Sequence, residues 1–200
     1  MRRLTRRLLL LVSLALVAAG LSFCVGPPTY YRDKYAPAVE GVQPAARPTP
    51  IVPEVQTEPH TCGLHAISAV YTAYGLDPLE LRLRFRLGTD KPLSHFIPDS
   101  IGTIHPDMLR VLAQDGFETE LLRPGGKDAA QLLREHLDAG HPALALTKPG
   151  TFHWVVVAAR EGENATICDS LRTEPCCKPL ENYLQEDVYS LLLVKPAAGR

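Results

Sequence analysis

Residues 56–75 of the chain read QTEPHTCGLHAISAVYTAYG. Apolar residues recur at helical spacing from residue 63 to residue 74, and Gly75 is placed to end the helix. Cys62 therefore lies in the first helical turn, where the positive end of the helix dipole lowers the pKa of a thiol and favours a nucleophilic thiolate. Gly63 would let a substrate backbone approach closely. Gln56 carries a side-chain amide that can donate a hydrogen bond to a developing oxyanion.

A candidate base for this thiol lies in the second half of the chain. His153 is placed near the start of the strongest predicted strand, residues 152–159, so its side chain can project over a cleft while the following residues anchor in the core. Asp169 ends the next predicted strand, and residues 161–164 are typical of a hairpin turn between the two. If these strands pair, Asp169 lies beside His153 and can hold the imidazole in place, as the third member of a triad does.

The rest of the body predicts helices first and an antiparallel sheet afterwards, which is an α+β domain. The segment 79–87 alternates Leu with Arg or Glu and fits a helix or a strand; we favour the helix and interpret Arg82, Arg84 and Arg86 as a solvated face. The predicted helices are 63–74, 79–87, 106–115 and 128–139, with Asp128 as a cap, and the predicted strands are 117–122, 143–147, 152–159, 165–169 and 188–195.

This pattern resembles the papain-like cysteine peptidases, specifically the C39-like branch found in bacterial exported proteins and bacteriocin-processing transporters. The resemblance implies a papain-like α+β fold, with a helical N-terminal half whose catalytic Cys packs on an antiparallel sheet. It also implies that Cys62 is the nucleophile, His153 the general base and acid, Asp169 its orienting partner and Gln56 the oxyanion donor. The stretches that carry it are Gln-x5-Cys-Gly, residues 102–106 (GTIHP), residues 140–143 (GHPA) and His-Trp-Val-Val-Val followed by Asp. The sequence departs from the family at Ser170, where Pro often follows the Asp.

Composition limits the alternatives. Hydrophobic residues make up 46% of the 200 residues and charged residues 22%, which fits one folded domain and excludes a disordered chain, a collagen-like rod or a polytopic membrane protein. The net charge of −1 argues against a nucleic-acid-binding protein. The charge is distributed unevenly along the chain. Residues 1–24 carry four Arg and no acid, which leaves 17 basic and 22 acidic residues, a net charge of −5, in the remainder.

The N-terminus predicts export. Four Arg between residues 2 and 7 precede an apolar run, so residues 1–25 are a signal peptide or an N-terminal membrane anchor. Leu21-Ser22-Phe23-Cys24 also resembles a bacterial lipoprotein box, although Phe23 departs from it, and lipid attachment to Cys24 stays open. Residues 26–51 are a Pro-rich linker, and residues 52–196 form the peptidase domain. We expect a monomer in the cell envelope, anchored in or lipidated at the membrane of a bacterium, or otherwise secreted.

Two other groups of residues were weighed for chemistry. His60, Cys62 and His65 have a spacing that invites zinc, but it matches no common structural site, and neither a metal nor a cofactor is expected. In an oxidising compartment, Cys168 could form a disulfide with Cys176 or Cys177, and this pairing stays open.

The sequence thus predicts an exported cysteine hydrolase that cleaves a peptide or isopeptide bond in a peptide or protein substrate. Two alternatives remain open. The same triad can transfer an acyl group to an amine or thiol, or the domain can be an inactive binding module on the envelope.

Overall fold

The computed structural model describes residues 38–92, 101–126, 128–148 and 152–198. The predicted leader, residues 1–25, and the first part of the predicted linker lie outside these residues. Within the part of the chain that is described, no helix has the length and apolar character needed to cross a membrane.

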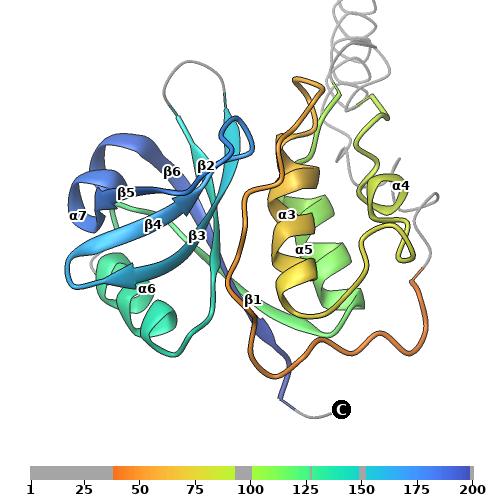
Figure 1. The fold of residues 1–200 in the computed structure, drawn as a ribbon, viewed down its shortest axis with the longest axis horizontal. Helices are drawn as coiled ribbons and strands as arrows, with labels where there is room; N and C mark the ends of the chain where they lie inside the picture. Colours follow the sequence, from red (N-terminus) through yellow and green to blue (C-terminus); the bar gives the residue numbers. More distant parts are fainter. Residues whose placement is uncertain (1–37, 93–100, 127, 149–151, 199–200) are drawn as a thin grey trace, which may run out of the picture.

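The chain forms a helical half followed by an antiparallel sheet, as predicted. The helical half and the sheet lie side by side, and α6 and α7 cover the outer part of the sheet (Figure 1). The sheet has six strands in the order β1-β6-β2-β3-β4-β5, all paired antiparallel. The elements are α3 (Cys62–Ala73), α4 (Leu83–Leu87), α5 (His105–Gln114), β1 (Phe117–Leu122), α6 (Ala129–Asp138), β2 (Ala143–Thr147), β3 (His153–Glu161), β4 (Asn164–Cys168), β5 (Cys176–Pro179), α7 (Leu180–Asn182), the π-helical turn η2 (Tyr183–Asp187) and β6 (Val188–Pro196).

Two apolar cores lie on opposite faces of the sheet. The larger joins α3 and α5 to one face through side chains such as Ile67, Val70, Met108 and Trp154. The smaller lies between the other face and α6, α7 and η2. Helix α3 is buried on almost every side, which fits its mainly apolar sequence. The N-terminus of α3, with Cys62, is therefore held rigidly against the sheet.

Most predicted elements form within one or two residues of their expected bounds, but the segment 79–87 does not. Its helix begins only at Leu83, because Arg82 adopts a left-handed conformation with φ of 51°. Before it, Asp77 accepts hydrogen bonds from the backbone N–H groups of Leu79 (2.7 Å) and Glu80 (3.3 Å), which hold the chain in turns. Asp128 precedes α6 as expected, but its side chain makes no capping hydrogen bond.

The predicted solvated arginine face is wrong for Arg86. Its side chain is 2% exposed and forms a bidentate ion pair with Asp115, at 2.6 and 2.8 Å. Tyr71 also donates to this carboxylate at 2.7 Å. A buried charge needs such partners, and here the pair joins α4 to the end of α5. Arg84 lies at the surface but is likewise held by ion pairs.

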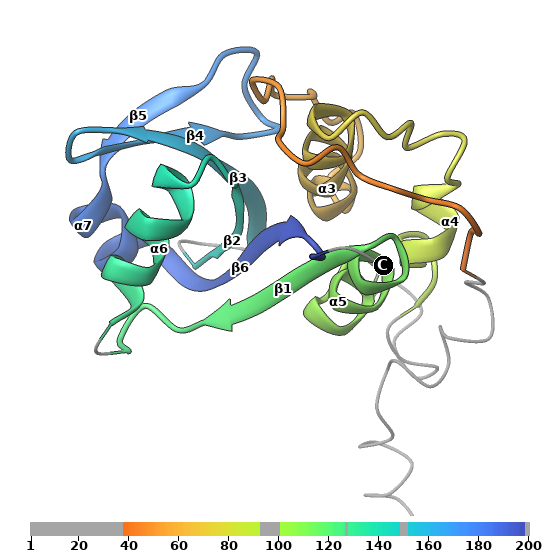
Figure 2. The same ribbon diagram turned by 90° about the horizontal axis from the view of Figure 1, so that it is seen from below.

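Residues 38–56, here called the N-terminal strap, run along the domain as part of its packed structure. Backbone N–H groups of Ala45 and Thr49 donate to carbonyls at the end of α3, at 2.9 and 2.8 Å. Val42 and Ile51 pack against the larger core. The strap crosses the helical half and ends beside the turn between β4 and β5 (Figure 2). The packed part of the chain thus begins before the predicted domain boundary at residue 52.

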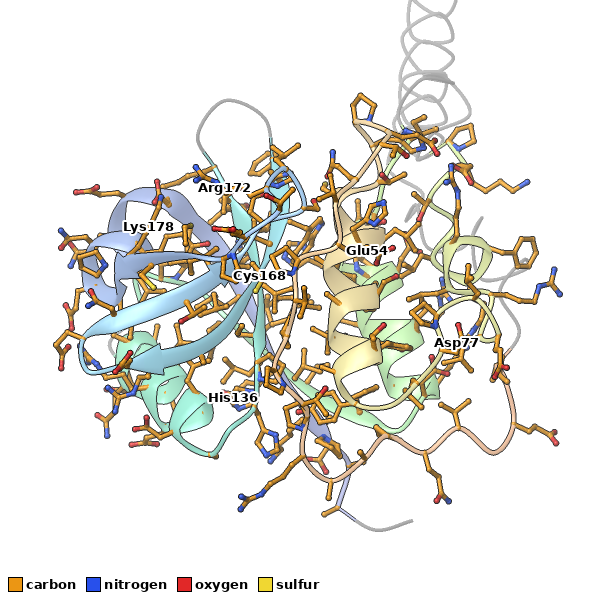
Figure 3. The ribbon with its side chains drawn as sticks, in the orientation of Figure 1. Glu54, Asp77, His136, Cys168, Arg172 and Lys178 are labelled. Atoms are coloured by element: carbon orange, nitrogen blue, oxygen red, sulfur yellow. The ribbon has the colours of Figure 1, made fainter. Side chains whose placement is uncertain are left out.

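The structure contains no disulfide between Cys168 and either Cys176 or Cys177. All four described cysteines are free. Cys168 lies on the face of the sheet that packs on the helical half (Figure 3), whereas Cys176 lies against the smaller core on the opposite face. Cys177 is exposed. The Cys168 thiol instead donates to the carbonyl of Ile51 in the strap, at 3.5 Å.

Candidate active site

Cys62 is the first residue of α3, as predicted. The loop before it is shaped by the carbonyl of Glu58, which accepts hydrogen bonds from the backbone N–H of Thr61 at 3.1 Å and from its hydroxyl at 2.8 Å. The thiol is largely buried and faces the start of β3. The helix dipole and the fixed loop together present the sulfur at the junction of the helical half and the sheet.

His153 and Asp169 lie at the ends of paired strands. His153 is the first residue of β3, and Asp169 directly follows β4, so the antiparallel register brings them together. His153 Nε2 lies 2.7 Å from Asp169 Oδ1. The same carboxylate oxygen accepts the backbone N–H of Leu171 at 2.9 Å, which fixes its position. Asp169 thereby sets the ring orientation of His153 and leaves Nδ1 for the thiol.

The thiol and the imidazole form a hydrogen-bonded pair with complementary pKa shifts. Burial alone would raise the pKa of Cys62, but hydrogen bonds from His153 and from the backbone N–H groups of Trp154 and Gly63 outweigh burial and lower it. The hydrogen bond to Cys62 raises the pKa of His153 against the effect of burial, with help from Asp169. Both shifts favour a thiolate beside an imidazolium, the state that a cysteine nucleophile requires.

Gln56 lies at the end of the strap and is held by Ser170, the residue after Asp169. The Ser170 hydroxyl donates to Gln56 Oε1 at 2.6 Å, and the backbone N–H of Gln56 donates to the Ser170 carbonyl at 2.9 Å. Gln56 Nε2 makes one long contact, 3.3 Å, with the carbonyl of Glu58. An amide nitrogen carries two hydrogens, so one N–H of this group is left for a ligand.

Ser170 was noted in the sequence only as a departure from the family pattern. Its side chain is 4% exposed, and its hydroxyl decides which end of the Gln56 amide faces away from the turn. Sequence spacing gave no sign of this contact, because Gln56 and Ser170 are separated by more than one hundred residues. The one hint in the sequence was that position 170 holds a polar residue where the family often has Pro.

Two hollows meet at this constellation. The first, here called the Cys62 hollow, has a volume of about 460 Å³ and is lined by Cys62, His60, His105, Leu146 and Trp154 among others. The second, here called the His153 hollow, has about 520 Å³ and is lined by Gln56, Glu58, Thr147, His153 and Leu171 among others. Pro59 and Phe152 line both. The two hollows therefore adjoin, and we call them together the cleft.

The wall of the Cys62 hollow is held by two contacts that the sequence analysis did not assign. Trp154 Nε1 donates to the carbonyl of Thr103 at 2.9 Å. His105 packs edge-on against Trp154 and lies 2.6 Å from the Ser190 hydroxyl. Burial, with the nearby Arg123, lowers the pKa of His105, which favours the neutral ring. His105 is thus a packed, hydrogen-bonded part of the wall of the Cys62 hollow.

Gly63 serves packing and not substrate approach. A Cβ added at this position would lie 2.6 Å from the Cβ of Thr103 and 3.0 Å from the Cε of Met108. Only a residue without a side chain allows the loop before α5 to lie this close to α3. The structure gives Gly63 this packing role in place of the expected role of making room for a substrate backbone.

The residues of the alternative zinc site are held apart by other partners. His60 Nε2 lies 3.0 Å from Asp90, and His65 Nδ1 lies 3.3 Å from Glu54. Cys62 is paired with His153 instead.

Glu58, His60 and Asp90 do cluster as a metal site would, but the guanidinium of Arg84 lies among them. It contacts both carboxylates at 2.8 Å. The guanidinium takes up the carboxylate oxygens of both residues as hydrogen-bond acceptors, so the residues do not fit a metal site. The cluster instead braces the loop that leads into Cys62.

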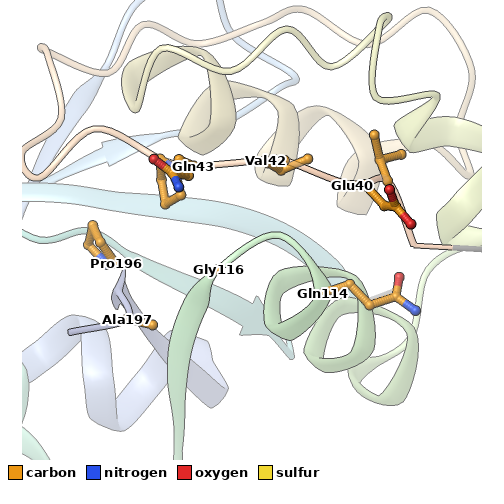
Figure 4. A pocket seen from close by; sticks show the side chains of 10 residues that line it. Glu40, Val42, Gln43, Gln114, Gly116, Pro196 and Ala197 are labelled. Atoms are coloured by element: carbon orange, nitrogen blue, oxygen red, sulfur yellow. The ribbon is translucent and has the colours of Figure 1, made fainter. Parts of the chain in front are cut away.

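A third hollow, of about 470 Å³, lies away from this cleft. It is formed by the strap and the ends of α5 and β6 (Figure 4). Glu40 is its one ionisable lining residue among those described, and it holds no nucleophile or imidazole. This hollow therefore lacks the thiol and imidazole that line the Cys62 and His153 hollows.

Solved structures of other proteins share this fold. A double glycine motif protease from an AMS/PCAT transporter, in complex with the leader peptide, matches with a TM-score of 0.52 and 23% identity over 78% of this chain and 99% of its own. The peptidase domain of Streptococcus ComA, a bi-functional ABC transporter of a quorum-sensing pathway, matches with a TM-score of 0.55 and 21% identity over 74% and 98%.

No protein-family model matches the sequence, and no curated protein is detectably similar to it. The structural likeness confirms the predicted fold, which is the papain-like α+β fold of C39 peptidase domains.

Proposed function

We propose that the protein is a cysteine peptidase that hydrolyses a peptide or isopeptide bond. The observation that carries this proposal is the continuous hydrogen-bonded chain from Cys62 through His153 to Asp169, at the meeting point of the two hollows. A buried thiol that served only packing would need no imidazole held by a carboxylate. The fold shared with two peptidase domains supports the same conclusion.

In the proposed reaction, the Cys62 thiolate attacks the carbonyl carbon of the scissile bond and forms a tetrahedral intermediate. His153, as imidazolium, gives its proton to the departing nitrogen, and the C–N bond breaks to leave a thioester on Cys62. His153, now neutral, removes a proton from water, whose oxygen attacks the thioester. The C–S bond then breaks, the acid is released and the thiolate–imidazolium pair is restored.

The oxyanion of both intermediates is bound by the Gln56 amide and the backbone N–H of Cys62. One N–H of Gln56 is free for this purpose, and the carboxamide is held from its other end by Ser170. A donor fixed before the reaction stabilises developing charge without reorganisation at the moment of attack. No metal or cofactor takes part in this scheme.

We further propose that the substrate is a peptide or protein met outside the cytoplasm and that the enzyme acts as a monomer. A solved structure with this fold is a protease in complex with a leader peptide, which supports a peptide as the substrate class. The Arg-rich, apolar residues 1–25 support export and attachment through the N-terminus. Cell fractionation with and without these residues, and labelling of Cys24 by a radioactive fatty acid, would test the attachment.

The activity is tested with the full-length chain and a mixed peptide library, by mass spectrometry of newly formed termini. Cys62→Ala should abolish cleavage, whereas Cys177→Ala, which removes an exposed thiol outside the cleft, should retain it. Unchanged cleavage by Cys62→Ala would refute the proposal. Products that carry an added amine acceptor would instead indicate acyl transfer.

An inactive binding module is distinguished by alkylation. Low-dose iodoacetamide at neutral pH should label Cys62 faster than Cys168, because burial, with the nearby Cys176, raises the pKa of Cys168 to about 11. Equal, slow labelling of both thiols would favour the binding module.

A further inference from the structure

The two hollows correspond to the two halves of a substrate, and the reaction fixes which half enters which. This step rests on the proposed function. The acyl half becomes attached to Cys62, which lines only the first hollow. The leaving half receives its proton from His153, which lines only the second. The segment that follows the scissile bond therefore lies in the His153 hollow.

The His153 hollow exposes two large apolar side chains. Phe152 is 64% exposed and Leu171 is 63% exposed, and both line this space. A monomer normally leaves such side chains exposed singly, and apolar side chains that converge on a hollow beside polar groups mark a ligand site.

The Phe152 side chain and the Leu171 backbone are held in place before any ligand arrives. The Phe152 ring packs edge-on against Tyr189, with 5.2 Å between the ring centroids. Leu171 lies in a turn fixed by the hydrogen bond from its backbone N–H to Asp169. The preformed apolar surface is thus tied to the residue that orients His153.

Each charged group among the described lining residues of the hollow has a partner, and that of His153 is Asp169. Glu58 is paired with Arg84 through two hydrogen bonds of 2.8 Å. Gln56 and Thr147 are neutral, and the Thr147 hydroxyl donates to the carbonyl of His153. The charged lining residues are thus already engaged, whereas Phe152 and Leu171 offer contact area to an apolar side chain.

We infer that the His153 hollow is a binding subsite for a bulky apolar side chain, carried by the first residue after the scissile bond. Phe152 and Leu171 form its walls. The substrate class is then a peptide in which a residue such as Leu or Phe supplies the amine that leaves.

This subsite can be tested before the natural substrate is known, because an amine that attacks the thioester occupies the same place as the leaving amine. The full-length chain is first acylated with benzyloxycarbonylglycine 4-nitrophenyl ester, whose acyl part has no side chain; the Cys62 thiolate forms the thioester and 4-nitrophenolate leaves. Leucine amide or glycine amide is then added. The amine nitrogen attacks the carbonyl, its proton passes to His153, the C–S bond breaks, and a dipeptide amide forms in competition with hydrolysis.

Leucine amide should be used about tenfold better than glycine amide at equal concentration, the range that an apolar pocket achieves for one side chain. Leu171→Ala should reduce this preference severalfold. The matched control is Leu79→Ala, which truncates a leucine that is 86% exposed outside the cleft and should keep the preference.

Equal use of the two amides, or an unchanged preference in Leu171→Ala, would overturn the subsite while the proposed peptidase stands. If 4-nitrophenolate release is the same in Cys62→Ala, the proposed function and the subsite are both overturned.

Discussion

Removing the Ser170 hydroxyl should weaken catalysis through Gln56 alone. In Ser170→Ala, the hydrogen bond of 2.6 Å to Gln56 Oε1 is lost, while the backbone bond of 2.9 Å between the two residues remains. The carboxamide is then restrained at its far end only by the contact of 3.3 Å to Glu58. It rotates among orientations in which Nε2 no longer meets the oxyanion.

The expected loss of kcat/KM lies between the loss of one hydrogen bond and the loss of the whole oxyanion donor. One neutral hydrogen bond is worth about 1 kcal/mol, which corresponds to a loss of about fivefold in kcat/KM. Complete loss of an oxyanion donor costs about 10²- to 10³-fold. Ser170→Ala should therefore lose about five- to tenfold, and Gln56→Ala considerably more.

The assay is a double-mutant cycle on 4-nitrophenolate release from benzyloxycarbonylglycine 4-nitrophenyl ester, with iodoacetamide alkylation of Cys62 measured in parallel. If Ser170 acts through Gln56, Ser170→Ala adds no further loss in the Gln56→Ala background, and Ser170→Thr restores much of the rate. Alkylation passes through no oxyanion, so its rate should not change. A loss of equal size in both backgrounds, or a parallel loss of alkylation, would refute this reasoning.

Four further predictions follow from the contacts of the site and of the core. Asp169→Asn removes one of the contacts that raise the pKa of His153. The imidazolium should then be lost at lower pH, so the alkaline, falling limb of the plot of kcat/KM against pH moves to lower pH. The value of kcat/KM itself should drop by about 10²- to 10⁴-fold. Wild-type alkylation of Cys62 should begin below pH ~8.5, the ordinary thiol range, because its pKa is lowered, and an onset at or above that value would contradict the ion pair. Asp115→Ala strands the buried Arg86 charge and should lower the free energy of unfolding by about 3–5 kcal/mol, measured by urea denaturation, whereas a loss under 1 kcal/mol would show that water reaches the pair. Gly63→Ala places a Cβ 2.6 Å from a loop side chain and should cost about 1–3 kcal/mol, visible as a lower Tm; an unchanged Tm would show that this loop yields freely.

Local patterns were sufficient to predict most elements and the meeting of three side chains. Cys62 at a helix start, and His153 and Asp169 at the ends of two hairpin strands, are positions that hydrophobic period and turn residues can locate. The hairpin register then brings the imidazole and carboxylate within 2.7 Å. No further long-range information is needed for that pair.

The contacts that were missed join segments far apart in the sequence or oppose their local pattern. Arg86 alternates with leucines like a solvent-facing residue, and only Asp115 on a different helix explains its burial. Strand β5 contains two cysteines, a lysine and a proline and pairs with one neighbour, β4, at the edge of the sheet, so it carries little apolar signal. The strap is rich in proline, which excludes helix and central strand but does not exclude packing on a finished domain.

The strap also has a mechanical consequence. A force applied to the chain before residue 38 acts on the backbone hydrogen bonds of Ala45 and Thr49 to the end of α3 before it acts on Gln56. Those bonds attach the strap to Ala73 and Tyr74, which are buried in the core, and they would carry part of the load. The end of the strap that carries Gln56 is thereby insulated from forces on the N-terminus, so this geometry allows the chain to be held at one end without disturbing the cleft.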